Sequence, residues 1–344
     1  MKKMPGVSVV VPCRNEAVFI REFIRSVMGQ DYPKDKLEVV IVDGESDDGT
    51  TGIIRDLCRK HRNIRCVNNP FRTIPHSLNL GISRSRKEYI VRMDVHSLYP
   101  SDYISQLVRW SEKLGSENTG GVIEVIPSSG TIKARVIADL VQSFFAIGNV
   151  QYRLSRDDRV KEVDTVPFGC FRRTVFSRFG MYDEEFLINE DDEYNLRLKM
   201  SGARVMLVPS IKVKYFSRDT FQKLFRQYFQ YGYWKPKVMK KHKCTASIRH
   251  AIPPLFSLFL LSGLPGLFFR SYRIVYGLVF SLYLLFAGSG AAYETICKKR
   301  PLYHVFLFIP GLFIIHTAYG LGFLKGAVDF ILLNRKPDKI GLTR

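Results

Sequence analysis

An acid and an imidazole stand two positions apart in this sequence, as Asp94 and His96, directly after the apolar run Tyr89–Met93. Residues i and i+2 of an extended chain point to the same side, so both side chains face one spot. Both are ordinary ligands of divalent cations. The alternative is a strand-end acid in a turn beside an incidental histidine, and the pair by itself does not separate the two interpretations.

Polar clusters also follow two earlier runs that are predicted to be buried strands. Asn15 and Glu16 follow the first run, and Asp43–Thr50 follows the second. Alternation of strands and helices predicts a parallel sheet covered on both faces, with ligands bound beyond the carboxyl ends of the strands. The three clusters then form one site. The predicted elements are the strand Val7–Pro12, a helix from Asn15 to Val27, the strand Leu37–Val42, a helix through Ile53–Leu57, the strand Ile64–Val67, the helix Ser77–Ser85 and the strand Tyr89–Met93.

Two common nucleotide motifs are missing from the sequence. No GxGxxG follows the first strand and no GxxxxGK[ST] occurs, which argues against a dinucleotide fold and a P-loop. A nucleotide site is then expected to use carboxylates for base and ribose, and a metal for the phosphates. Asp43 is predicted to accept hydrogen bonds from base or ribose, whereas Asp48 and Thr50 are explained equally well as a turn and helix cap.

Four consecutive acids occur at 190–193, before the apolar positions of a predicted helix. Glu190 and Asp191 could cap that helix, whose dipole favours anions there. Arg197 follows Glu193 by four residues, which is the spacing of a helical ion pair. We expect Phe186–Ile188 to be a strand that carries Asp191 to the same edge of the sheet, where an ionised carboxylate can act as a general base.

Between these motifs, Gly169 stands among aromatic residues, where it could floor a sugar or acceptor site. Arg172 and Arg173 follow it and have two open interpretations, contact with phosphate or ordinary surface charge. Six cysteines are scattered without zinc-ligand spacing and are expected to be free thiols.

The net charge of +20 is unevenly placed, because a basic cluster immediately precedes an apolar C-terminal region. Cations at this position follow the positive-inside bias and attract anionic headgroups, so we expect a membrane partner and no nucleic acid. No secretory signal follows Met1, so the polar part is expected in the cytoplasm. The apolar segments are Ile252–Phe269, which Pro and Gly interrupt, then Ile274–Ala292 and Leu302–Leu324, which approach the roughly 20 residues of a membrane span, with Phe323–Leu333 as a candidate return helix.

In order along the chain, these motifs resemble glycosyltransferase family 2, and within it the bacterial exopolysaccharide transferases of the succinoglycan type. The resemblance covers about residues 5–235. It rests on Val-Ser-Val-Val-Val-Pro-Cys-Arg-Asn-Glu, Val-Asp-Gly-Glu-Ser-Asp-Asp-Gly-Thr, Asn79-Leu-Gly81, Asp94-x-His96, Glu190-Asp191-x-Glu193 with Arg197, and the runs Gln227–Lys235 and His316–Gly322.

The resemblance implies an α/β nucleotide-diphospho-sugar transferase domain of the GT-A type, with a mostly parallel sheet followed by C-terminal transmembrane or interfacial helices. It implies a nucleoside pocket lined by Pro12, Arg14, Glu16 and Asp43, a metal motif at Asp94 and His96, and a catalytic base at Asp191. To these we add Glu190 as a catalytic residue, and as substrate-binding residues Asp48, Arg92, Gly169 and Trp234.

Two departures from the family pattern bear on these expectations. The usual motif is Asp-x-Asp, and His96 replaces the second acid, which leaves the metal as Mg²⁺ or Mn²⁺. Processive synthases carry Gln-x-x-Arg-Trp, and Tyr233 precedes Trp234 here, which argues against a long processive polymerase.

We therefore predict an inverting, metal-dependent transferase of the inner membrane, with its catalytic domain in the cytoplasm. The expected partners are a nucleotide-sugar, first of all a UDP-sugar, and a lipid-linked acceptor. The expected organisation is a catalytic domain over 1–235, a basic segment over 236–251, a membrane region over 252–333 with two or three transmembrane helices, and a polar tail over 334–344. The alternatives are a transferase that loads a sugar onto polyprenyl phosphate and, in another class, a membrane transport protein with a nucleotide-binding domain.

Overall fold

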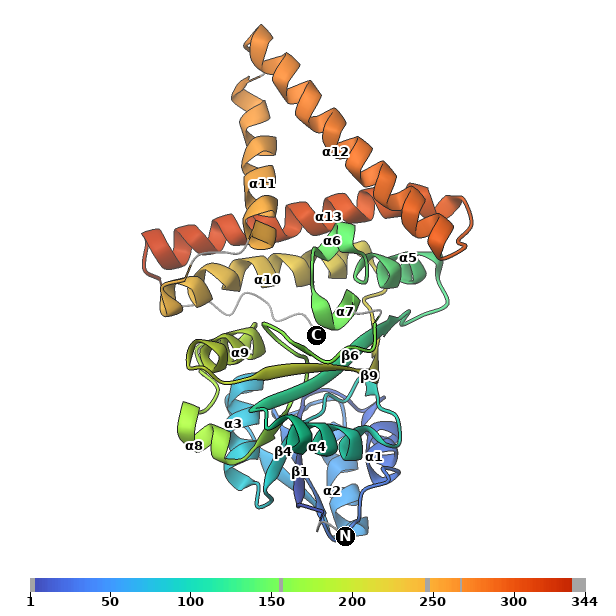
Figure 1. Cartoon of the computed structure of the whole chain (residues 1–344), viewed down its shortest axis with the longest axis vertical. Coiled ribbons are helices and arrows are strands. Elements are labelled where there is room, and N and C mark those ends of the chain that lie inside the picture. The colour runs from blue at the N-terminus through green and yellow to red at the C-terminus, as the bar shows by residue number, and fades with distance from the viewer. Residues whose placement is uncertain (1–3, 155–156, 245–247, 267, 336–344) are drawn as a thin grey trace. The chain divides into compact units, whose positions relative to one another are not determined.

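The computed structural model describes the chain except residues 1–3, 155–156, 245–247, 267 and 336–344 (Figure 1). It contains two compact units. The first comprises Met1–Glu124 and Gln151–Tyr215, and the second comprises Val125–Val150 and Phe216–Arg344. The second unit therefore includes a stretch that lies, in sequence, between the two parts of the first. This division differs from a single boundary near residue 235.

The first unit is built on a parallel sheet, as the sequence predicts. β1 pairs in parallel with β2 on one side and β4 on the other, and β2 pairs in parallel with β3. β1 and β2 are buried along their whole length, which accounts for their unbroken β-branched sequence. The elements of this part are β1 (Val7–Cys13), α1 (Ile20–Met28), β2 (Leu37–Asp43), α2 (Thr50–Lys60), β3 (Ile64–Asn68), α3 (Ile74–Arg84) and β4 (Tyr89–Arg92).

The strand order places a topological switch point between β1 and β4. The order begins β3-β2-β1-β4, so the chain leaves β1 towards β2 and later returns to its other side. Ligands of open α/β sheets bind at the carboxyl ends of strands at such a point. Helix α3 lies directly on the sheet here, because a Cβ at Gly81 would come within 2.4 Å of Val10. The loops after β1, β2 and β4 thus share one edge.

Antiparallel strands extend the sheet beyond β4, which makes it mixed. β8 pairs with β4 and with β6, and β9 pairs with β5 and β7, all antiparallel. Among the described residues the sheet has nine strands. These elements are β5 (Ser97–Leu98), α4 (Tyr103–Leu114), β6 (Asn118–Ile126), α7 (Gln151–Leu154), β7 (Lys161–Glu162), β8 (Cys170–Arg172), α8 (Thr174–Phe179), α9 (Glu190–Met200) and β9 (Val205–Phe216).

One predicted element is wrong. Phe186–Ile188 is irregular, with a bend at its last two residues, and is not a strand. Its apolar character has a different cause, since Phe186 is a core residue with only 1 % of its surface exposed. The acids at 190–193 are therefore positioned by a turn and by the start of α9. The ion pair expected within that helix is present, with Arg197 3.0 Å from Glu193.

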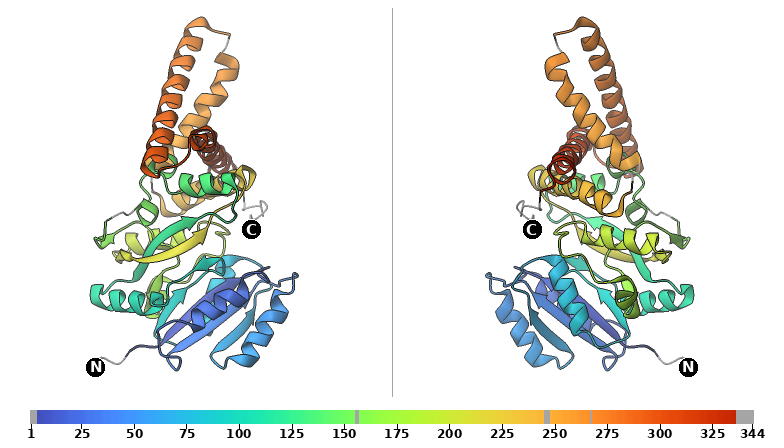
Figure 2. Two further views of the ribbon diagram at one scale, coloured as in Figure 1. Left: turned by 90° about the vertical axis from the view of Figure 1, so that its right-hand side faces the viewer. Right: turned by 90° about the vertical axis from the view of Figure 1, so that its left-hand side faces the viewer.

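The second unit is helical (Figures 1 and 2). Each of the three apolar segments of the sequence contains a long helix, and the described residues include two helical stretches long and apolar enough to cross a membrane, Arg270–Cys297 and Tyr303–Leu332. The elements are α5 (Ile132–Leu140), α6 (Phe144–Ile147), α10 (Phe221–His242), α11 (Ile248–Gly266), α12 (Arg270–Cys297), α13 (Tyr303–Gly326) and the π-helix η1 (Ala327–Leu332).

Candidate active site

Asp43, at the end of β2, organises the loop that follows it. Its carboxylate accepts hydrogen bonds from the backbone N–H and hydroxyl of Ser46, at 3.1 and 2.6 Å, and from the hydroxyl of Thr51 at 2.5 Å. The side chain is buried. Asp43 thus fixes the loop after β2, and its place in a nucleoside pocket stays a prediction.

Of the two roles considered for Asp48, a turn and helix cap or substrate binding, the structure shows the first. One oxygen accepts from the backbone N–H and hydroxyl of Thr50, at 3.0 and 2.5 Å, and the other accepts from the N–H of Ala17 at 3.1 Å. The hydroxyl of Thr50 in turn accepts from the N–H of Glu16 at 2.8 Å. These bonds tie the loop after β1 to the start of α2, and a substrate contact of Asp48 stays a prediction.

Arg14 carries a polar atom that suits an anionic ligand. Its Nε is buried, and within the described part of the chain it has no hydrogen-bond partner. The side chain lies along Gly44, where an added Cβ would approach it to 3.4 Å. A buried guanidinium nitrogen without a partner is costly, and a phosphate oxygen would satisfy it. Pro12, two residues earlier, is buried within β1 and sets the direction of this loop.

His96 and Glu16 form a pair across the two loops. Nδ1 of His96 lies 3.0 Å from a carboxylate oxygen of Glu16. A carboxylate that holds one ring nitrogen of a histidine is the usual support for a metal ligand, because it orients the ring and leaves Nε2 for the cation. The backbone of Asp94 is fixed nearby, where its N–H donates to the Tyr99 hydroxyl at 2.8 Å.

Arg92 joins the metal motif to the acidic helix. Its Nε lies 3.1 Å from Asp94, and its Nη1 lies 3.0 Å from Glu190 of α9. The three side chains are almost fully buried, with exposed fractions of 8, 14 and 7 %. The Arg92 N–H also donates to the carbonyl of Gly169 at 3.1 Å. Arg92 thus holds elements that are far apart in sequence at the carboxyl end of β4.

The acids around Arg92 have raised pKa values. Burial raises the pKa of Glu190 to about 7, against the opposing effect of Arg92 and with a further rise from Asp191. Burial also raises the pKa of Asp191, which Arg92 again opposes and the charges of Asp192 and Asp94 increase. The helix N-terminus was expected to hold Asp191 ionised, and burial outweighs that effect. A carboxylate of raised pKa is a stronger base.

The pKa of Glu190 predicts an acid limb in the pH profile of activity. Below about pH 7 Glu190 is protonated, so Arg92 loses one charged partner and pairs only with Asp94. We expect kcat/KM of the unaltered protein to fall as the pH drops through 7. In Glu190→Gln the limb near pH 7 should be lost, which leaves only the ionisation of Asp191, and the plateau should be about tenfold lower, the loss of one charge-assisted hydrogen bond.

A kcat/KM profile over pH 5.5–9 tests this, with His96→Gln as the control, because His96 belongs to the same candidate site and pairs with Glu16. The limb must persist in the His96 variant. A limb that survives in Glu190→Gln and vanishes in His96→Gln would contradict the assignment.

Gly169 and Trp234 have packing roles. Gly169 has φ of 69°, and a Cβ there would come within 2.6 Å of Phe171, so the backbone turns tightly beneath Arg92. Trp234 belongs to the second unit, where it is buried and packs with Tyr233 and Phe330. A substrate contact of Trp234 stays a prediction.

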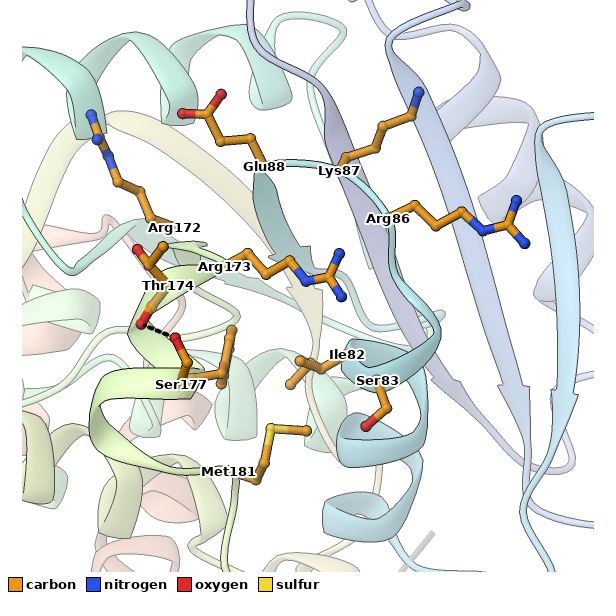
Figure 3. A pocket seen from close by; sticks show the side chains of 11 residues that line it. Ile82, Ser83, Arg86, Lys87, Glu88, Arg172, Arg173, Thr174, Ser177 and Met181 are labelled. Carbon is orange, nitrogen blue, oxygen red and sulfur yellow. Dashed lines mark hydrogen bonds between the residues drawn. The ribbon is translucent and has the colours of Figure 1, made fainter.

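The other open residues, Arg172 and Arg173, line a hollow at the opposite end of β4 (Figure 3). This hollow has a volume of about 710 Å³ and is also lined by Arg86 and Lys87. In Figure 3 Arg86 and Arg172 point in opposite directions, so these charges do not converge on one point. The structure therefore places Arg172 and Arg173 away from the carboxyl-end rim.

The residues at the rim fit a divalent cation held jointly with a ligand. No group of three or more His, Cys, Asp or Glu among the described residues is arranged to hold a metal by itself. Mg²⁺ and related ions are, however, commonly bound by one or two protein groups together with substrate phosphates and water. Asp94 and His96 are such a pair. The carboxylates of Asp94, Glu190 and Asp191 also exceed the charge of Arg92, which favours a cation.

Three residues of the rim were not foreseen as such. Ser46 and Thr51 bind Asp43, and Tyr99 binds the backbone of Asp94. Ser46 and Thr51 flank the recognised Asp48–Thr50 turn, so their position was the available signal. Tyr99 follows the metal motif by only a few residues, but nothing in its spacing predicts a side chain that folds back.

Comparison with known proteins gives the family of the chain. The model of glycosyl transferase family 2 matches residues 8–180. The chain is 30 % identical to a succinoglycan biosynthesis protein, ExoA, of Rhizobium meliloti over 247 residues, 71 % of this chain and 73 % of that protein. It is 24 % identical over 333 residues to a dolichyl N-acetyl-glucosaminyl phosphate diacetamido-dideoxyglucuronosyltransferase of Methanococcus voltae, 94 % of this chain and 98 % of that protein.

Among solved structures, a mannosyltransferase of Pyrobaculum calidifontis, PcManGT, in complex with GDP-Man and Mn²⁺ superposes with a TM-score of 0.56 at 18 % identity. The match covers 95 % of this chain and 87 % of that one. This likeness confirms the GT-A-like fold. The family model, together with the relative from R. meliloti, shows that the chain belongs to glycosyl transferase family 2 and is a glycosyltransferase.

Proposed function

We propose that this glycosyltransferase moves a sugar, with inversion, from a nucleoside diphosphate to a hydroxyl of a lipid-linked glycan. The observation that carries the proposal is the arrangement at the switch point, where Arg92 bridges Asp94 and Glu190 and lies within the charge range of Asp191. The proposed metal ligand Asp94 and the acids at the start of α9 are thus held together in one buried cluster. The transport alternative has lost its support, because the family is enzymatic.

The loops after β1 and β2 would bind the donor. The Asp43 loop receives the nucleoside, and the buried Nε of Arg14 donates to the diphosphate. Asp94 and His96 would hold Mg²⁺ or Mn²⁺, which when bound neutralises the departing diphosphate. Support comes from the Glu16–His96 pair and from the similar mannosyltransferase, which was solved with GDP-Man and Mn²⁺. A UDP-sugar is our first candidate donor.

Asp191 would be the general base. As the acceptor oxygen attacks the anomeric carbon, its proton passes to the Asp191 carboxylate and the bond from that carbon to the diphosphate oxygen breaks. One displacement gives inversion. Glu190 holds Arg92, and the raised pKa of Asp191 suits proton abstraction. A transferase that loads polyprenyl phosphate would need no such base, because its acceptor is already ionised.

Two further observations support a lipid-linked acceptor and a location at the inner membrane. The relative from M. voltae is named for transfer to a dolichyl-phosphate-linked sugar, and it aligns with nearly this whole chain. Two helices of the second unit have the length and composition of membrane spans. We infer a catalytic domain on the cytoplasmic side and an acceptor presented at the membrane surface.

Calorimetric titration of the detergent-solubilised protein with UDP-, GDP- and dTDP-sugars tests the donor class. We expect one nucleotide to bind in Mn²⁺ and to lose at least tenfold in affinity when EDTA is added. Arg14→Ala should weaken that binding, whereas Arg173→Ala, in the hollow at the other end of β4, should not. Equal binding with and without the metal would contradict metal-dependent donor binding.

A further inference from the structure

The three apolar helices of the second unit are not equivalent. α11 and α12 rise from α13 as two arms joined at their far end (Figures 1 and 2). α13 instead lies alongside α10, crossing the base of both arms. We propose that the chain enters the bilayer only through the α11–α12 hairpin, and that α13 lies with α10 along the cytoplasmic surface. The proposal rests on the membrane attachment inferred under the proposed function.

The hairpin presents apolar side chains to its surroundings over most of its length. On α12, Leu278 and Leu285 are 60 and 67 % exposed, and on α11 Leu255 is 63 % exposed. α12 has no Asp, Glu, Lys or Arg from Ile274 to Tyr293, a stretch of roughly 30 Å in a helix, which matches the hydrocarbon thickness of a bilayer. Surface of this kind needs lipid around it.

The two arms also contact each other. Phe256 stacks on Tyr283 with ring centroids 4.3 Å apart, and Phe259 stacks on Tyr276 at 4.6 Å. The Tyr276 hydroxyl donates to the carbonyl of Leu260 at 3.4 Å. The Tyr276 hydroxyl is thus used within the hairpin, whereas the Tyr283 hydroxyl lies 3.0 Å from Nδ1 of His316 on α13, so both have partners, as hydrocarbon surroundings require.

α13 is excluded from the hydrocarbon centre by its neighbour. Glycines bring the two helix backbones into contact, since a Cβ at Gly322 would lie 2.1 Å from the carbonyl of Phe229, and one at Gly326 equally close to that of Tyr233. Gly232 meets the Tyr319 carbonyl in the same way, at 2.0 Å. α10 therefore accompanies α13 over several turns. It carries six cations, which are costly at the centre of a bilayer: Lys223, Arg226, Lys235, Lys237, Lys240 and Lys241.

Both ends of α13 are held by polar contacts. At its start, His304 lies 3.1 Å from Asp139 of α5, which also accepts two hydrogen bonds from Arg300. After its end, Asp329 accepts from the hydroxyl of Tyr233 at 3.0 Å. A spanning helix has its ends at opposite membrane surfaces, whereas these ends are fixed to α5 and α10, two charge-bearing helices of the same layer.

The charge balance gives the orientation. Lys298, Lys299 and Arg300 follow the base of the hairpin, in addition to the cations of α10, and the far end has Arg270 and Arg273. The larger positive charge marks the cytoplasmic side. Two crossings then return the chain to that side before α13 begins.

Single-cysteine labelling tests this topology. In a background with the natural cysteines replaced by serine, we would introduce Phe268→Cys at the far end of the hairpin or Leu333→Cys after η1, and would retain Cys297 alone as the base control. A membrane-impermeant maleimide should label position 268 at least tenfold better in right-side-out vesicles. Positions 297 and 333 should show the opposite preference.

Position 333 labelled from the outside would overturn the proposal in favour of three crossings. Position 268 unlabelled from the outside would overturn it in favour of a hairpin that does not cross. If the serine background does not fold, phosphatase and fluorescent-protein fusions after residue 344 of the otherwise unaltered chain distinguish the same topologies. A fluorescent fusion is expected, because the proposal places this end of the chain in the cytoplasm. An active phosphatase fusion would contradict the proposal. Donor binding has no part in these readouts, so a failure of the proposed transfer reaction is detected separately.

Discussion

Asp191→Asn should reduce sugar transfer at least about a hundredfold while donor affinity stays within about twofold of the unaltered protein. The magnitude is that of removing a positioned general base, about 10²–10⁴ in rate. The amide keeps the shape and the hydrogen bond from the neighbouring N–H, but it cannot take a proton. Radiolabelled sugar transfer to a lipid extract measures the rate, and calorimetry measures donor binding.

The control for this variant is Asp192→Asn, which removes the next acid of the same helical turn. We expect it to keep activity within about fivefold, because its charge acts on Asp191 only through space. If Asp191→Asn retains normal turnover, Asp191 is not the base. Such a result would favour a phosphate acceptor, which needs no deprotonation.

Asp94→Asn should abolish the response of donor binding to Mn²⁺. The substitution removes the proposed charged ligand of the cation and one of the two carboxylate partners of Arg92. We expect transfer to fall by about 10²–10³, the loss associated with a single group that stabilises developing charge. Titration of the donor at increasing Mn²⁺ measures the effect, with the affinity in EDTA nearly unchanged.

Asp47→Asn is the matched control, since Asp47 is an exposed acid of the loop after β2. Its backbone N–H donates to the side-chain oxygen of Asn15, and this bond does not involve its carboxylate. It should leave the Mn²⁺ response intact. A metal response that persists in Asp94→Asn would move the cation site to other residues and remove the support for His96 as its partner.

The parallel half of the sheet was predictable because its signal is local. Unbroken β-branched runs, each followed by polar residues, mark β1, β2 and β4 and the edge at which they end. The antiparallel half was not predictable in this way. β5 and β7 are only two residues long, and their pairing with β9 depends on segments more than forty residues distant in sequence. Phe186–Ile188 shows the opposite error, since core burial produces the same apolar triplet as a strand.

The sequence indicates which residues are candidates for the site better than it indicates which of them contact one another. Asp94, His96, Glu16 and Asp191 were each marked by a motif, but the pairing of His96 with Glu16 joins two loops and has no sequence signal. Arg92 is the clearest case. It occupies a position in β4 that favours apolar residues, and only the fold shows that Asp94 and Glu190 enclose its charge.

The discontinuity of the second unit has a practical consequence for obtaining the catalytic part in water. A protein truncated after residue 235 would still contain Val125–Val150, whose α5 depends on residues removed by the cut: Leu140 packs against Gly311, and Asp139 binds Arg300 and His304. The truncation would therefore expose the apolar face of α5 that includes Leu140, and it would leave the buried carboxylate of Asp139 without Arg300 and His304. A water-soluble fragment needs two excisions, with Val125–Val150 replaced by a short turn.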